Sequence, residues 1–163
     1  MPHEIERKFL VAKMPFDLAM LEHDLLEQGY LAIDPELHEV RIRKAGEAYY
    51  LTVKSGGRLT REEYEINLEP RQFEALWPAT EGRRLRKTRY YIKRGSPQVT
   101  IDVYEGRFQG LNLAEVEFAS QEEARSYRPP KWMGKEVTGH SFLKNRNLLD
   151  VDSFEEVARM LAI

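Results

Sequence analysis

Charged and apolar side chains alternate at the amino terminus of the chain. Glu4, Glu6 and Lys8 fall at every second position, with Ile5 and Phe9 between them. Successive side chains of a β-strand point to opposite faces, so a strand here carries its charges on one face. The same alternation returns in later strand-like segments, at Arg41 and Arg43, Lys54, Arg61, Glu63 and Glu65, Lys87 and Arg89, Asp102, and Glu115 and Glu117. The sequence therefore predicts a sheet with one apolar and one densely charged face.

Two arrangements can accommodate such a face. An open sheet packed on helices would leave the charges in water, but solvated faces usually mix charged with neutral polar residues. Here Thr52 and Thr100 are among the few neutral polar residues on the charged face. Closure of the sheet into a barrel would instead line a lumen with charges of both signs. The pattern favours the barrel, whose lumen would suit a highly charged guest.

The acidic residues of this face indicate a metal site. Carboxylates two positions apart on a strand are about 7 Å apart along the backbone, close enough for Glu side chains to converge on one cation. This spacing occurs at Glu4 and Glu6, at Glu63 and Glu65, and at Glu115 and Glu117. All-oxygen ligation favours Mg²⁺ or Mn²⁺. Zinc is not indicated, because the four histidines show no paired ligand spacing and are expected to have surface or packing roles.

The basic residues would form a cationic wall opposite the metal. Arginine supplies bidentate forks and lysine supplies point charges, and both suit phosphate oxygens. A metal that joins carboxylates to phosphates, faced by arginine and lysine, is the recurring arrangement for phosphoryl transfer. A polyphosphate chain is the guest that fits this lumen best. The wall would consist of Lys8, Arg41, Arg43, Lys54, Arg61, Lys87 and Arg89.

Composition places the chain among globular proteins. Its 163 residues, 42% of them apolar, suit a single domain over residues 1–163. No stretch approaches the length of a membrane span, and no basic and apolar leader is present, so a cytoplasmic location without membrane partners is expected. Cysteine is absent, which excludes disulfides and thiolate sites. The net charge of −2, from 25 basic and 27 acidic residues, gives no reason to expect nucleic acid.

Periodicity and turn residues predict the order of the elements. A helix is expected from Asp17 to about Gln28, ended by Gly29, and a second helix from Pro70 to about Ala79. A third is expected over 121–127, and a final helix capped by Asp152 or Ser153 should end near Ala162. The remaining regular segments read as successive hairpin strands over 30–33, 38–44, 48–54, 61–68, 85–93, 99–104 and 112–119.

The motifs, in this order, resemble those of the CYTH domain, or triphosphate tunnel metalloenzymes. The first-strand signature Glu4-x-Glu6-x-Lys8 carries the resemblance, and it extends over nearly the whole chain. The later motifs are Arg41-x-Arg43, Tyr50-Leu51-Thr52-Val53-Lys54, Arg61-x-Glu63-x-Glu65, Lys87-x-Arg89, Asp102, Glu115-x-Glu117 and Glu136-Val137-Thr138-Gly139. The segment from Gly139 to Arg146 departs from the family's usual acidic and aromatic ending.

The resemblance implies an α+β fold: an eight-stranded antiparallel barrel that forms a tunnel, with helices outside and a plug helix over 153–162. Short bacterial members are often inorganic triphosphatases, which split tripolyphosphate into pyrophosphate and phosphate with a divalent metal. Lys87 and Tyr30 match a catalytic pair, and the seven residues of the cationic wall match phosphate binders. A small-molecule triphosphate is the expected partner of a monomer or homodimer. The implied metal ligands are Glu4, Glu6, Glu115 and Glu117, with Glu63, Glu65 and Asp102 as helpers or ligands of a second metal.

Other activities of the same family stay open. Thiamine triphosphatase and class IV-type adenylyl cyclase both need a site for an organic group, which aromatic residues could provide. A non-catalytic module that senses polyphosphate is an alternative of another class, but a pure anion receptor gains nothing from the carboxylates unless metals bind there. The aromatic candidates are Tyr49, Tyr50, Tyr90, Tyr91 and Trp132, for which packing outside the barrel is the more ordinary role.

Overall fold

The computed structural model of this chain describes residues 5–34, 38–55, 62–140, 143 and 145–163. Within these ranges no helix is long and apolar enough to cross a membrane. The strands are β1 (Ile5–Val11), β2 (His23–Ile33), β3 (His38–Ala45), β4 (Ala48–Ser55), β5 (Glu62–Asn67), β6 (Arg84–Lys93), β7 (Gln98–Tyr104), β8 (Asn112–Phe118) and β9 (Met133–Glu136). The α-helices are α1 (Pro70–Leu76), α2 (Gln121–Ser126), α3 (Asn145–Leu148) and α4 (Phe154–Leu161); the 3₁₀ turns are η1 (Leu18–Met20), η2 (Trp77–Thr80) and η3 (Gly106–Phe108).

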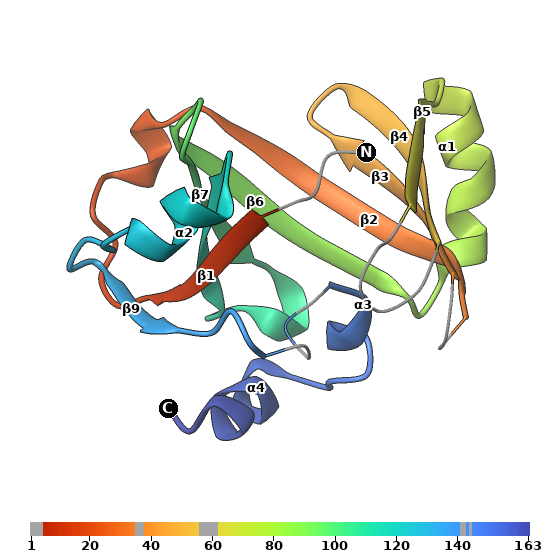
Figure 1. Cartoon of the computed structure of the whole chain (residues 1–163). Coiled ribbons are helices and arrows are strands. Elements are labelled where there is room, and N and C mark those ends of the chain that lie inside the picture. Colours follow the sequence, from red (N-terminus) through yellow and green to blue (C-terminus); the bar gives the residue numbers. More distant parts are fainter. Residues whose placement is uncertain (1–4, 35–37, 56–61, 141–142, 144) are drawn as a thin grey trace.

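All nine strands belong to one antiparallel sheet, in the order β5-β4-β3-β2-β6-β7-β8-β1-β9. The sheet is strongly curved (Figure 1). In this view β1 lies toward the left and β5 toward the right. Its two outer strands are not joined to each other by a ladder in the described residues. The expected α+β tunnel is confirmed as a tunnel-like barrel whose sheet is not closed. In the described residues the sheet has nine strands rather than the expected eight, because β9 forms beside β1 from the turn-rich segment near the carboxyl end.

The helix expected from Asp17 to Gln28 is wrong. Asp17 caps only the short turn η1, where its side chain accepts from the backbone N–H of Ala19. Of the leucines that suggested a helical stripe, Leu18 lies in η1 and Leu21 directly follows it, while Leu25 and Leu26 belong to β2, which pairs with β3 on one side and β6 on the other. Two full ladders outweigh a weak local preference for helix. Gly29, expected to end a helix, lies inside β2, where a Cβ would come within 2.5 Å of Thr80 in η2.

The strand register brings the predicted charged residues to one face. Lys8 lies opposite Glu115, and Arg89 lies opposite Asp102. Tyr30 pairs with Arg41, which in turn pairs with Thr52. Partners directly opposite in a ladder share a face, so these residues lie on the concave inner face of the sheet.

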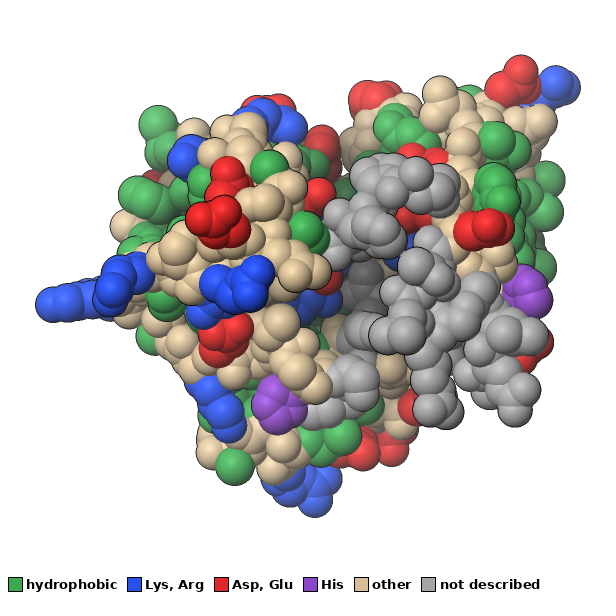
Figure 2. Space-filling view, viewed as in Figure 1, with side chains coloured by type: hydrophobic (Ala, Val, Ile, Leu, Met, Phe, Trp, Pro, Cys, Tyr) green, Lys and Arg blue, Asp and Glu red, His purple; other side chains and the backbone are tan. Residues whose placement is uncertain are grey.

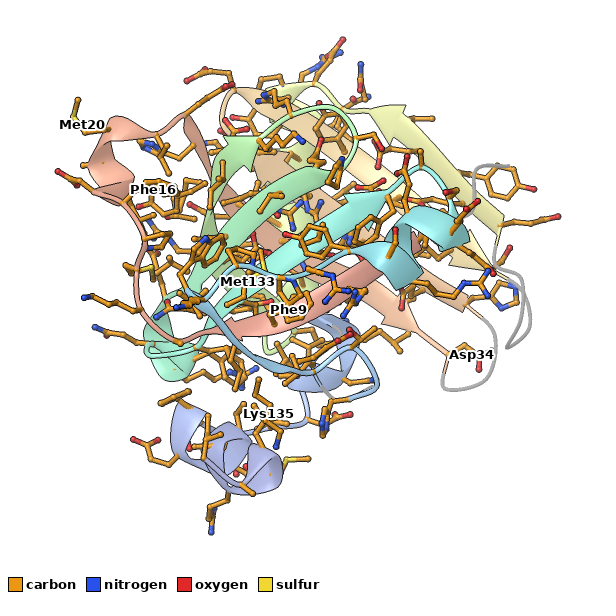
Figure 3. All side chains as sticks on the ribbon, turned by 60° about the vertical axis from the view of Figure 1, so that its left-hand side comes forward. Phe9, Phe16, Met20, Asp34, Met133 and Lys135 are labelled. Carbon is orange, nitrogen blue, oxygen red and sulfur yellow. The ribbon has the colours of Figure 1, made fainter. Side chains whose placement is uncertain are left out.

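The outer face carries the apolar residues and is covered by helices. Around β1, β7 and β8 the apolar cluster includes Phe9, Ile101, Val116 and Met133, with side chains of α2 and the segment after it packed against it. Figure 3 shows Phe9 and Met133 close together. On the other half of the sheet α1 contributes Phe73, whose ring lies 5.2 Å from that of Tyr49. This layering leaves the charges inside.

The carboxyl-terminal segment fills one end of the barrel. Four residues that continue the inner face, Leu10, Leu85, Tyr104 and Leu113, belong to a second apolar cluster with residues of α3 and α4. Ser153 caps α4 through its side chain, as expected, and the helix ends at the left-handed Ala162. Lys135, labelled in Figure 3, donates its ammonium to the Leu161 carbonyl at 2.7 Å. We call this closed end of the barrel, made by the cluster and α4, the plugged end.

Truncation of the plug should destabilise the protein. Leu161 is fully buried at 0% exposure, so Leu161→Ala is expected to lower the free energy of unfolding by about 2 to 4 kcal/mol through the cavity it leaves. Urea unfolding followed by circular dichroism measures this. The neighbouring Met160 is 47% exposed, and Met160→Ala is the control with a change below about 0.5 kcal/mol. Equal stability of the two variants would contradict the packing of α4 on the barrel.

Candidate functional site

A buried ion cluster occupies the middle of the inner face, on β6, β7 and β8. The Asp102 carboxylate binds the Lys87 ammonium at 2.7 Å and receives two hydrogen bonds from Arg89, at 2.8 and 2.9 Å. Arg89 also reaches Glu115 at 3.4 Å. The side chains of Lys87 and Asp102 are only 3% and 4% exposed. Buried charges persist only when paired, and here two cations share one fully buried carboxylate.

Burial changes the proton affinities in this cluster. Loss of water lowers the pKa of Lys87 to about 8; Asp102 opposes this shift, and the guanidiniums of Arg89 and Arg43 add to it. Burial alone would raise the pKa of Asp102, but Lys87 and Arg89 hold it well below its usual range. Lys87 can therefore lose a proton near neutral pH, which an ordinary lysine cannot do.

A second group of cations lies beside this cluster on β3, next to Tyr30 and Gln28 of β2. Arg41 is 8% exposed and contacts Tyr30, whose pKa is raised by burial. Burial and the nearby guanidiniums of Arg41 and Arg89 lower the pKa of Arg43 to about 10. Arg43 donates through Nε and Nη2 to the side-chain oxygen of Gln28, at 2.9 and 2.6 Å. Cations that depress one another's pKa are stabilised by a polyanion placed between them.

The carboxylates of β1 and β8 lie at the other edge of the cluster. Glu6 is opposite Glu117 in the ladder and contacts Glu115. Burial would raise the pKa of Glu115, but its contact with Glu6 and the charges of Arg89 and Lys8 lower it. Lys8 lies 3.4 Å from Glu6. Adjacent carboxylates on neighbouring strands provide the all-oxygen donor set that Mg²⁺ or Mn²⁺ accepts, so these residues fit the implied metal.

The described residues alone do not complete a metal site. No three acidic or histidine side chains among them gather closely enough to hold an ion. Glu4, which the first-strand signature places two residues before Glu6, lies outside the described residues, and so does Arg61. Both oxygens of Asp102 are bound by Lys87 and Arg89. The metal roles of Glu4 and Asp102 stay predictions.

The predicted residues of β4 and β5 form a separate part of the site. Lys54 pairs in the ladder with Glu39 on one side and Glu63 on the other. Glu65 accepts a hydrogen bond from the buried Thr52 at 3.0 Å. Glu63 and Glu65 are exposed. Glu63 and Glu65 lie on β5, the outer strand that pairs with β4. Glu6 and Glu115 lie on β1 and β8, near the opposite edge of the sheet. Their role at a second metal also stays a prediction.

The aromatic candidates divide between the two faces. Tyr49 packs on α1, Tyr90 packs on His23, and Trp132 packs against the outer apolar cluster. Tyr50 shares the inner face with Arg43, its ladder partner. Tyr91 lies opposite Thr100 on the inner face, and its hydroxyl donates to Asp24 at 3.1 Å. Only these last two are on the side where an organic group could meet the site.

Three inner residues were missed by the motif pattern. Gln28 lay hidden inside the wrongly expected helix. Glu39 is two residues before Arg41 and is 5% exposed, so the alternation itself could have identified it. Tyr104 is two residues after Asp102, and its ring centroid is 5.2 Å from the Lys87 ammonium. Each follows from the strand period once the strand is recognised.

Comparison with known proteins agrees with this architecture. The family model of the CYTH domain matches residues 2–159. An inorganic triphosphatase of Nitrosomonas europaea is 48% identical over 146 residues, which are 89% of this chain and 95% of the relative. An inorganic triphosphatase of Acetivibrio thermocellus is 32% identical over 91% of this chain and 94% of the relative.

Solved structures give the same result. A crystal structure of an inorganic triphosphatase is 45% identical and superimposes with a TM-score of 0.73 over 91% of this chain and 95% of the other. A conserved hypothetical protein from Pyrococcus furiosus is 16% identical and shares the fold, with a TM-score of 0.54 over 99% of this chain and 91% of the other. The charged inner face, the order of the motifs and these matches together establish that the chain belongs to the CYTH domain family.

Proposed function

We propose that this protein hydrolyses inorganic triphosphate to pyrophosphate and phosphate in its barrel. The observation that carries the proposal is the inner layer of the buried Lys87 and Arg41 and the half-buried Arg89 and Arg43, set beside the carboxylates of β1 and β8. A tripolyphosphate chain supplies the negative charge that this layer lacks. The inorganic triphosphatases at 48% and 32% identity support the same reaction.

The metal is proposed to be Mg²⁺ or Mn²⁺, bound by Glu6, Glu115 and Glu117 together with Glu4. When bound it would neutralise phosphate charge and polarise the P–O bonds. This chain's cations would hold the phosphate oxygens, with arginine forks on β3 and β6 fixing the orientation. Lys8 lies beside the carboxylates, 3.4 Å from Glu6 and opposite Glu115, where it would bind the phosphate nearest the metal.

Lys87 is the proposed general base. Neutral Lys87 would accept a proton from water as the water oxygen bonds to the terminal phosphorus, and the bridging P–O bond would break to release pyrophosphate. Asp102 holds the Lys87 nitrogen in place at 2.7 Å. Tyr30 contacts Arg41 and would orient the substrate or the water. The proposed pair therefore acts from two neighbouring strands, β6 and β2.

The pH profile should reveal the base. Because burial lowers the pKa of Lys87 to about 8, the neutral form that accepts a proton becomes more abundant as the pH rises. We expect kcat/KM to increase about tenfold per pH unit below about pH 8 and to level off above it. The measurement is kcat/KM for tripolyphosphate from about pH 6 to about pH 9.5 at saturating metal. A flat profile across this range would contradict Lys87 as the base.

The test of the function is phosphate release from tripolyphosphate, ATP and thiamine triphosphate, with Mg²⁺, with Mn²⁺ and with a chelator. We expect metal-dependent release that is fastest from tripolyphosphate. Faster turnover of thiamine triphosphate, or cyclic AMP from ATP, would replace the proposal by one of the other family activities. Tight tripolyphosphate binding without turnover would indicate a sensing module instead.

Nucleic acid is not a proposed partner. On the face shown in Figure 2, acidic and basic side chains of the described residues are interspersed. This agrees with the net charge of −2. Binding of a nucleic-acid backbone relies on a basic surface that neutralises many phosphates. The cations of the candidate site lie instead on the inner face of the sheet, beside carboxylates.

A further inference from the structure

Gln28 is a buried neutral side chain among the cations of the inner face. It is 1% exposed and lies in one ladder row between Arg43 of β3 and Leu85 of β6. Leu85 belongs to the apolar cluster of the plugged end. Gln28 therefore lies directly beside an apolar residue of this end, and the next inner residue of β2, Tyr30, again pairs with a cation, Arg41.

The orientation of the Gln28 amide is fixed by its partner. A guanidinium has only donors, so the amide oxygen must face Arg43, and it accepts from both Nε and Nη2 of that residue. The amide nitrogen then points away from Arg43. Among the described residues this buried nitrogen has no hydrogen-bond partner. The buried Nε of Arg41, on the adjacent row of β3, lacks one as well.

Unpaired buried donors are costly. Leaving a buried donor unsatisfied costs about 1 to 3 kcal/mol, so proteins rarely keep one without a use. Leucine or methionine at this place would fill the same space without that cost. Two such donors on neighbouring strands, beside three guanidiniums, match the several acceptor oxygens of a phosphate group.

We propose that Gln28 binds the substrate directly, donating its amide N–H to an oxygen of the phosphate that Arg43 holds. This rests on the proposed function and assigns Gln28 a second role besides anchoring Arg43.

A double-mutant cycle separates the two roles of Gln28. Gln28→Met, Arg43→Met and the double variant remove side chains without adding charge, and KM for tripolyphosphate is measured for each. If Gln28 only anchored Arg43, removing it after Arg43 is gone would change nothing. If Gln28 contacts the substrate itself, we expect the Gln28→Met substitution to raise KM a further roughly fivefold to tenfold in the Arg43→Met background. A double variant with the KM of Arg43→Met alone would overturn the proposal.

Measuring tripolyphosphate binding in the presence of a chelator separates the affinity from metal-dependent turnover. Calorimetric titration of tripolyphosphate into the same four proteins should show the same stepwise loss of affinity, with thermal unfolding used to confirm that each is folded. Gln109→Met, at an exposed position of the β7–β8 loop, is the matched control and should bind as the wild type does. Wild-type protein that neither binds nor hydrolyses tripolyphosphate would overturn the proposed function. Wild-type activity with no further loss in the double variant overturns only the role of Gln28.

Discussion

Lys87→Met is expected to lower kcat for tripolyphosphate by at least about 100-fold, the usual contribution of a general base. Methionine keeps an unbranched side chain that is only one atom shorter, but it cannot accept a proton. The fold should tolerate the change, because Asp102 keeps both hydrogen bonds from Arg89 and its charge stays paired. The rise of kcat/KM toward pH 8 should disappear in the same variant.

Steady-state phosphate release at saturating substrate measures this effect. Lys44→Met is the matched control, since Lys44 alternates with Arg43 on β3 and therefore lies on the outer face. Tyr30→Phe tests the other member of the proposed pair by removing only its hydroxyl. Turnover near that of the wild type in both Lys87→Met and Tyr30→Phe would remove the pair from the mechanism.

Glu115→Gln should reduce metal-dependent turnover by on the order of 1000-fold, because several kcal/mol of charge stabilisation by the ion depend on its ligands. The amide is the same size as the carboxylate but lacks its charge. Glu6→Gln is expected to act in the same direction, since Glu6 contacts Glu115. The concentration of Mg²⁺ or Mn²⁺ needed for half-maximal activity should rise in both variants.

Metal titrations of activity and calorimetric metal binding measure the two effects separately. Glu27→Gln provides a control with the same chemical change on a barrel strand, because Glu27 alternates with Gln28 and points to the outer face. A raised metal requirement in all three variants would indicate a general loss of negative charge. An unchanged requirement in Glu6→Gln and Glu115→Gln would show that neither residue holds the metal.

The faces of the strands could be predicted from the sequence, whereas the partners of each side chain could not. Alternation of charged with apolar residues is a local property, and it placed Lys8, Arg89 and Glu115 on the inner face. Which side chains meet depends on the register between strands far apart in the chain. The Lys87 ammonium thus binds Asp102, on the neighbouring strand β7, a contact that no spacing along the chain encodes.

The error in β2 had a physical origin. Between Asp17 and Gln28 the leucines recur at intervals that also fit a helix, and Asp17 is a good cap residue. What decides the outcome is pairing with β3 and β6, neither of which a local pattern can reveal. Gln28 was overlooked for the same reason, since its place on the inner face follows only from the strand period.

The plugged end also governs how molecules enter and leave. Leu85, Tyr104 and Leu113 pack with residues of α3 and α4, so among the described residues apolar side chains occupy that end of the inner face. We therefore expect substrate and both products to use the opposite end of the barrel. Pyrophosphate would leave along the route by which the next triphosphate arrives, and while bound it would occupy the same cations. Competition between product and substrate is thus a direct outcome of how the last helix packs.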